Sequence, residues 1–219
     1  MFAHAVNDTR PVNVLAHALL AGDDAALRLG GVMGDFVRGT PDLALPPRVR
    51  DGIYLHRAID VFTDSHDEVR AARERLPAPF RRYAGILLDM WFDHCLARDF
   101  TKWSGRPLDE FSTALRVEMH AATPILPDSL KRFLGYMDAN DLPAGYIEPE
   151  AIGKALRGIS QRLSRANPVA EAMPLLLSED TMLRGTFERF FPQLRDFARE
   201  WCGSRFSGDS QAASAPSPA

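Results

Sequence analysis

Apolar residues recur along this chain at helical spacing, and no segment keeps the polar–apolar alternation of a strand. In residues 13–21, for example, Val14, Leu15, Ala18 and Leu19 fall on one face of a helix. The pattern therefore predicts an all-α fold of about eight to ten helices that pack by ridges and grooves. We predict helices over residues 13–21, about 24–37, 47–62, 66–75, 80–99, 107–122, 128–137, 148–165, 169–177 and 181–202.

Residues at the ends of these segments support the predicted boundaries. Asp23 or Asp24 suits the N-cap of the second helix, and Pro46 with Pro47 suits the start of the third. Ser65, with Glu68 three residues later, fits the N-cap of the fourth, and further prolines separate later segments.

Three glycines lie inside the second predicted helix, where each costs about 1 kcal/mol relative to alanine. They are Gly30, Gly31 and Gly34. Either close packing between helices or a close approach of the backbone to a ligand would explain them, and the sequence leaves both open.

The length and composition indicate one domain. The chain has 219 residues, of which 46% are hydrophobic and 25% charged, enough apolar material for one substantial core. We expect a single compact multi-helix domain over residues 12–202. Residues 203–219 are small, polar and proline-containing, which predicts a disordered tail.

Several classes of protein are disfavoured by the same composition. A formal net charge of −3 gives little general attraction to nucleic acid, so no nucleic-acid partner is expected. No run of eighteen apolar residues predicts a membrane span, and no secretory signal is recognisable. Two cysteines, Cys95 and Cys202, form neither a disulfide framework nor a zinc ribbon. We therefore expect a cytoplasmic protein and make no prediction of its oligomeric state.

Two pairs of potential metal ligands lie four residues apart in predicted helices. They are His56 with Asp60 and Asp89 with Asp93. Residues at this spacing share a helix face, so each pair can direct two side chains to one point. Asp89 lies within an apolar run, where a carboxylate is costly to bury without a partner.

Further polar residues accompany these pairs. Asp64 follows Asp60 by one helical turn, His94 follows Asp93 directly, Asp35 lies near a helix end, and His17 lies among apolar residues of the first helix. Carboxylate and imidazole ligands suit Mg, Mn, Fe or Zn, and such an ion offsets the repulsion of clustered carboxylates. A bound ion would polarise a phosphoryl oxygen and lower the pKa of a bound water.

Simpler explanations exist for each of these residues. A His-x3-Asp pair arises often by chance on a solvated helix face, and a buried histidine such as His17 commonly bonds a backbone carbonyl. Cys95 follows His94 directly, which is poor geometry for a catalytic pair, and a core thiol explains it as well. The chain has neither a Gly-x-Ser-x-Gly motif nor a phosphate-binding glycine loop ending in Lys-Ser/Thr.

The order of these residues resembles the acyl carrier protein phosphodiesterase family over about residues 12–200. The resemblance is carried by NVLAH (13–17), GDFVRG (34–39), GIxLHRxIDxFTD (52–64), LDxxxDHxL (88–96) and ILP (125–127). It implies an all-helical fold distantly related to HD-domain phosphohydrolases. One departure from HD sites is that the only His-Asp dipeptide, His66-Asp67, lies in a capping context, so HD ligands are not carried over one for one.

The resemblance also implies a reaction. The family cleaves the phosphodiester joining 4′-phosphopantetheine to a serine of holo acyl carrier protein, the expected partner, with Mn²⁺ or Mg²⁺ as cofactor. We therefore predict a metal shell and a set of residues for catalysis or proton transfer. The shell contains Asp35, His56, Asp60, Asp89 and Asp93, and the second set contains Asp35, His17, Asp64 and His94.

Arginines near these segments are candidates for binding the substrate. Arg38 and Arg57 could neutralise phosphate charge, although surface ion pairs would explain them equally well. Residues 70–82 hold five arginines, including Arg70 and Arg73, against the single acid Glu74. Such an excess could dock an acidic carrier protein, although a solvated helix face would look the same.

Two other functions fit the same residues. One is an HD-like phosphohydrolase acting on a nucleotide or another small phosphodiester. The other is a helical module that binds a carrier protein without chemistry, its aspartates being structural.

Overall fold

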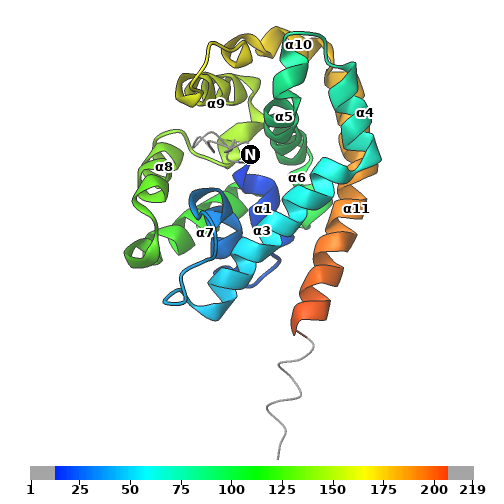
Figure 1. Cartoon of the computed structure of the whole chain (residues 1–219). Coiled ribbons are helices and arrows are strands. Elements are labelled where there is room, and N and C mark those ends of the chain that lie inside the picture. Colours follow the sequence, from blue (N-terminus) through cyan, green and yellow to red (C-terminus); the bar gives the residue numbers. More distant parts are fainter. Residues whose placement is uncertain (1–12, 207–219) are drawn as a thin grey trace, which may run out of the picture.

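A computed structural model describes residues 13–206, and all regular elements in this range are helical (Figure 1). Eleven α-helices and five short 3-10 helices succeed one another along the chain, which confirms the predicted all-α class. The α-helices are α1 (Val14–Leu20), α2 (Ala25–Met33), α3 (Pro47–Ser65), α4 (Asp67–Arg75), α5 (Ala84–Arg98), α6 (Phe100–Ser104), α7 (Leu108–Ala121), α8 (Asp128–Ala139), α9 (Pro149–Arg162), α10 (Met173–Ser178) and α11 (Asp180–Phe206). The 3-10 helices are η1 (Gly34–Phe36), η2 (Phe80–Tyr83), η3 (Thr123–Ile125), η4 (Ala144–Ile147) and η5 (Val169–Glu171).

Most predicted boundaries agree with these elements, and the exceptions have local causes. Asp24 caps α2 by accepting from the backbone N–H groups of Ala26 and Leu27. The predicted cap at Ser65 is wrong, because α3 runs through that residue and the ring of His66 accepts from the N–H of Glu68.

The predicted helix over residues 24–37 is divided in two. The α-helix ends at Met33, and the tighter turn η1 follows with Asp35 at its centre. At the other end of the chain, α11 continues to Phe206, so residues 203–206 are helical rather than part of a disordered tail. The rest of that predicted tail, residues 207–219, lies outside the described residues.

Helices α2 and α3 pack backbone against backbone. A Cβ atom on Gly30 would lie 2.1 Å from the carbonyl oxygen of Val49, and one on Gly52 would lie 2.1 Å from that of Leu27. Close helix packing therefore explains Gly30, whereas a ligand does not. This contact fixes α3, which carries His56 and Asp60, against α2, which is followed directly by η1 with Asp35.

Helix α5 occupies the middle of the structure and contacts α1, α9 and α11 (Figure 1). Leu87, Trp91 and Leu96 on this helix are fully buried. Since α11 packs against α3, α4 and α5, the long C-terminal helix closes one side of the helical assembly. No helix among residues 13–206 is both long and apolar enough to cross a membrane.

Candidate metal centre

A cavity of about 440 Å³ opens between α1, α3, α5 and α11. Part of its lining is apolar and includes Phe92, Phe187 and Phe190. The rest of the lining is rich in aspartates. The lining includes six of the residues predicted as ligands or catalytic groups, namely His17, Asp35, Asp60, Asp64, Asp89 and Asp93, and two of the arginines predicted to bind substrate, Arg57 and Arg73.

Two buried histidines lie beside these acidic residues. His17 on α1 and His56 on α3 are 2% and 1% exposed, and their rings stack with centroids 3.8 Å apart. Burial in this way is unusual for histidine unless its ring nitrogens are used. The sequence alone predicted His17 as a proton-transfer group, and the structure puts it beside His56.

The ring of His56 is held in one orientation. Its Nδ1 lies 2.8 Å from the carbonyl oxygen of Gly31, which can only accept, so Nδ1 carries a hydrogen. In the neutral ring, Nε2 then presents a lone pair. That atom lies 3.4 Å from Oδ1 of Asp35 and 3.3 Å from Oδ2 of Asp60.

Asp60 faces both histidines. Its Oδ1 lies 3.3 Å from Nε2 of His17, while its Oδ2 lies beside Nε2 of His56. One ligand atom from each of these three residues falls within 4.8 Å of the other two, which is close enough to share one ion. The pairing of His56 with Asp60 predicted from their spacing is therefore present, with His17 as its third member.

The chemistry of these groups fits a bound cation. Nε2 of His56 and both ring nitrogens of His17 are buried without a hydrogen bond of good geometry. A lone pair directed at two carboxylates is repulsive unless a proton or a metal ion lies between them. Two imidazoles and a carboxylate form a donor set that first-row divalent metals accept.

The pKa values of the two rings reflect the competition between burial and the nearby carboxylates. Burial opposes charge on His56, but the contacts with Asp35 and Asp60 outweigh it and raise its pKa to about 10. Burial and the neighbouring His56 instead lower the pKa of His17. Without a metal ion, His56 would therefore hold a proton near neutral pH while His17 stays neutral, and an ion bound by both rings would have to displace that proton.

Asp93, which was predicted as a metal ligand, contacts the start of α1. Its two carboxylate oxygens each accept, at 3.0 Å, from the backbone N–H groups of Leu15 and Ala16 at the start of α1. Asn13, the N-cap residue of α1, makes no side-chain cap bond, so a residue on α5 provides the cap instead. Asp93 is fully buried, and burial raises its pKa to about 7 although the two N–H groups oppose the shift. It positions α1, and with it His17.

Replacing Asp93 with alanine is expected to lower the free energy of unfolding by about 2–3 kcal/mol, because one buried and one partly buried donor lose their acceptor. Chemical denaturation measured by circular dichroism tests this value. Asp109→Ala, which removes an exposed acid from the first turn of α7, is the matched control and is expected to change stability little. An unchanged midpoint for Asp93→Ala would rule out the capping role.

Asp89 lies in the same cavity but outside the three-residue group. Burial raises its pKa well above the ordinary value, and the negative charge of Asp60 adds to this shift while Arg73 opposes it. The predicted proximity to Asp60 is therefore present. A carboxyl group with this pKa can hold a proton near the cluster.

Two other predicted residues are not part of the cluster. His94 points away from the cavity, where its Nδ1 donates to the carbonyl oxygen of Tyr146 at 2.8 Å and its ring packs on Trp91. Asp64 is at the edge of the cavity, 67% exposed, and pairs with Arg73 at 2.5 Å. The structure thus supports a packing role for His94 rather than proton transfer.

The predicted phosphate-binding arginines differ in position. Arg57 lines the metal cavity, with Nη2 donating to the carbonyl oxygen of Val37 at 2.9 Å. Arg38 is exposed on the loop after η1, where it lines a second cavity. Arg73 is held by Asp64, and Arg70 lies on the exposed surface of α4 next to Asp67. Of these four arginines, only Arg57 lines both cavities.

Two glycines that sequence reasoning left unexplained support His56. Gly31 supplies the carbonyl that orients the ring, and a Cβ atom on Gly34 would lie 2.2 Å from Cγ of His56. Their roles depend on contacts across 22–25 residues of sequence, so helical periodicity could not reveal them.

Comparison with known proteins gives consistent matches. The sequence model described as "Acyl carrier protein phosphodiesterase" matches residues 12–194. A protein of that name from Klebsiella pneumoniae (strain 342) is 38% identical over 191 residues, which cover 85% of this chain and 97% of the relative. Its namesake from Escherichia coli O6:H1 is 35% identical over the same shares of both chains.

A third relative with the same name, from Shigella boydii serotype 18, is 36% identical over 84% of this chain and 95% of its own length. No solved structure gives a significant match. Since the family match and these relatives cover most of the chain, including every residue of the candidate metal centre, the chain belongs to the acyl carrier protein phosphodiesterase family.

Proposed function

We propose that this protein hydrolyses the phosphodiester linking 4′-phosphopantetheine to a serine of holo acyl carrier protein. The products would be the apo carrier protein and free 4′-phosphopantetheine. The observation that carries the proposal is the convergence of His17, His56 and Asp60 on one point beside a cavity, in a chain whose relatives are named for this reaction. A cytoplasmic location remains part of the proposal.

His17, His56 and Asp60 would hold a Mn²⁺ or Mg²⁺ ion, with Asp35 beside them as a further carboxylate ligand. Two imidazole nitrogens in the set favour Mn²⁺, because Mg²⁺ prefers oxygen ligands. When bound, the ion would polarise a phosphoryl oxygen and lower the pKa of a bound water.

The remaining groups of the cavity would bind the phosphate and move protons. The Arg57 guanidinium lines the cavity near Asp35 and is suited to neutralising phosphate charge. Asp89, whose pKa is raised, would protonate the serine oxygen as its bond to phosphorus breaks. The neighbouring phenylalanines exclude bulk water from one side of the site.

The direct test is to incubate the purified protein with holo carrier protein and Mn²⁺ and to weigh the carrier by mass spectrometry. The carrier is expected to lose the mass of its phosphopantetheine group, and prior dialysis of the enzyme against a chelator is expected to prevent this loss until Mn²⁺ is restored. An unchanged carrier would refute the proposed reaction. Loss at an equal rate without metal would refute the metal site alone.

Asp89→Asn is expected to reduce turnover of holo carrier protein by about 10²-fold or more, because an amide neither gives nor takes a proton at this position. Asp35→Asn is expected to reduce turnover by a similar factor, because it removes the negative charge of a proposed metal ligand. Asp128→Asn, an exposed residue of α8, serves as the control. The reaction rate is followed by mass spectrometry and the helical content by circular dichroism. Wild-type turnover by Asp89→Asn would exclude its role in proton transfer.

A further inference from the structure

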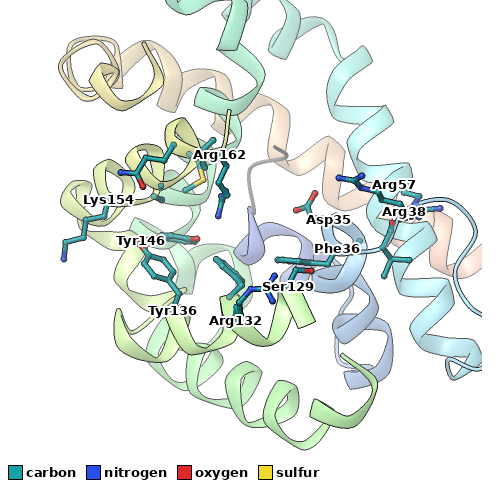
Figure 2. A pocket seen from close by; sticks show the side chains of 18 of the residues that line it. Asp35, Phe36, Arg38, Arg57, Ser129, Arg132, Tyr136, Tyr146, Lys154 and Arg162 are labelled. Atoms are coloured by element: carbon teal, nitrogen blue, oxygen red, sulfur yellow. Dashed lines mark hydrogen bonds between the residues drawn. The ribbon is translucent and has the colours of Figure 1, made fainter. Parts of the chain in front are cut away.

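A second and larger cavity adjoins the candidate metal centre. It measures about 790 Å³ and lies between η1 with the loop that follows it and the helices α8 and α9 (Figure 2). Asp35 and Arg57 line both cavities, so the two hollows meet beside the metal ligands. A volume of this size is typical of sites for small molecules of drug-like size.

The lining of this cavity contains both apolar and polar side chains. Phe36 and Phe133, whose ring centroids are 5.7 Å apart, form an aromatic wall with Met90 nearby. Ser129, Gln161 and Arg132 contribute polar side chains, and Figure 2 shows Arg162 reaching from α9 toward the middle of the cavity. Such a surface suits a ligand that is itself apolar in some parts and able to form hydrogen bonds in others.

The position of Asp35 indicates how a substrate would enter. A phosphodiester held at the metal centre has two substituents, a serine on a folded carrier protein and a narrow, flexible pantetheine chain. A folded domain cannot enter a cavity of this size, whereas a chain can. Pantetheine carries two amides and a hydroxyl beside a pair of methyl groups, which matches the mixed lining.

We propose that this second cavity binds the pantetheine chain of the substrate, with the phosphate at the Asp35 end and the thiol end between α8 and α9. The identity of the ligand rests on the proposed function, whereas the position of its site rests on the junction of the two cavities at Asp35 and Arg57. The smaller cavity, with its clustered carboxylates, is left for the metal ion and water.

Gly158 on α9 provides a way to block the cavity selectively. It lines the cavity, and a Cβ atom added there meets no atom within 4 Å, so Gly158→Leu would fill the space without disturbing the helix. Ala155→Leu, one turn earlier on the same lining face, is a second blocking variant. The control is Gly135→Leu on α8, where an added Cβ also meets no atom but which is not part of the lining.

The binding test uses 4′-phosphopantetheine and inorganic phosphate as probes, each titrated calorimetrically into the Mn²⁺-loaded protein. The Kd for 4′-phosphopantetheine is expected to rise at least tenfold in both blocking variants and to stay unchanged in Gly135→Leu. The Kd for inorganic phosphate is expected to be the same in all four proteins. The proposal is overturned if the blocking variants bind 4′-phosphopantetheine normally, or if the wild type binds it no more tightly than phosphate.

Turnover of holo carrier protein separates this proposal from the proposed function. If the wild type and both blocking variants cleave the carrier equally, the cavity assignment fails while the reaction stands. If no protein cleaves it but the blocking variants still lose 4′-phosphopantetheine binding, the reaction fails while the cavity assignment stands.

Discussion

Replacing His56 with alanine is expected to reduce Mn²⁺-dependent hydrolysis of holo carrier protein by about 10³-fold or more. Loss of a residue that only orients a ligand commonly costs roughly 10–100-fold, and His56 is a candidate ligand itself. Its Nε2 lies between Asp35 and Asp60, so its removal leaves two carboxylates facing each other without the group that separates them. Both metal affinity and turnover should therefore fall.

The measurement is kcat/KM for holo carrier protein, together with the Kd for Mn²⁺ from titration calorimetry. Because His56 is buried, its removal also leaves a space, and Asp60→Asn is the companion variant that keeps the volume. His120→Ala is the matched control, since His120 is exposed and pairs with Asp138 away from the cavity. Normal Mn²⁺ binding by both His56→Ala and Asp60→Asn would contradict the ligand set.

Helical periodicity predicted the fold well, because each long helix buries one regular apolar face. The predictions failed where a boundary depends on a single side chain. At Ser65 the sequence offers a typical capping residue, but the chain continues in α3 and His66 makes the cap. Short elements such as α6 are too brief to show a period, so none was predicted there.

Spacing in the sequence predicted the site only where its residues lie close together in one helix. His56 and Asp60 share a face of one helix, and their spacing brought both into the candidate centre. Asp89 and Asp93 share a face in the same way, yet both oxygens of Asp93 accept from backbone N–H groups 77 and 78 residues away in the sequence. His94 is adjacent in sequence and therefore points about 100° away, out of the cavity. Contacts between distant segments decide these roles.

Gly34→Ala is expected to weaken Mn²⁺ binding by about 10–100-fold without removing any ligand, because it displaces a ligand's ring. The added Cβ would lie 2.2 Å from Cγ and 2.3 Å from Cδ2 of His56. That ring cannot move aside easily, since Gly31 holds its Nδ1 and His17 stacks on its face. Gly34 has φ −52° and ψ −41°, which alanine adopts freely, so the effect is steric and not one of backbone strain.

The same overlap is expected to lower the free energy of unfolding by about 1–3 kcal/mol, as overpacking in a core does. Gly135→Ala makes the same chemical change on α8 at a point where the new Cβ meets no atom within 4 Å. That variant should be as stable as the wild type or about 1 kcal/mol more stable, because alanine favours helix over glycine. Calorimetric Mn²⁺ titration and denaturant unfolding of both variants separate a general glycine effect from a local one. If Gly34→Ala binds Mn²⁺ as the wild type does, then the ring of His56 either yields without cost or is not a ligand, and the packing of η1 against α3 does not set the geometry of the centre.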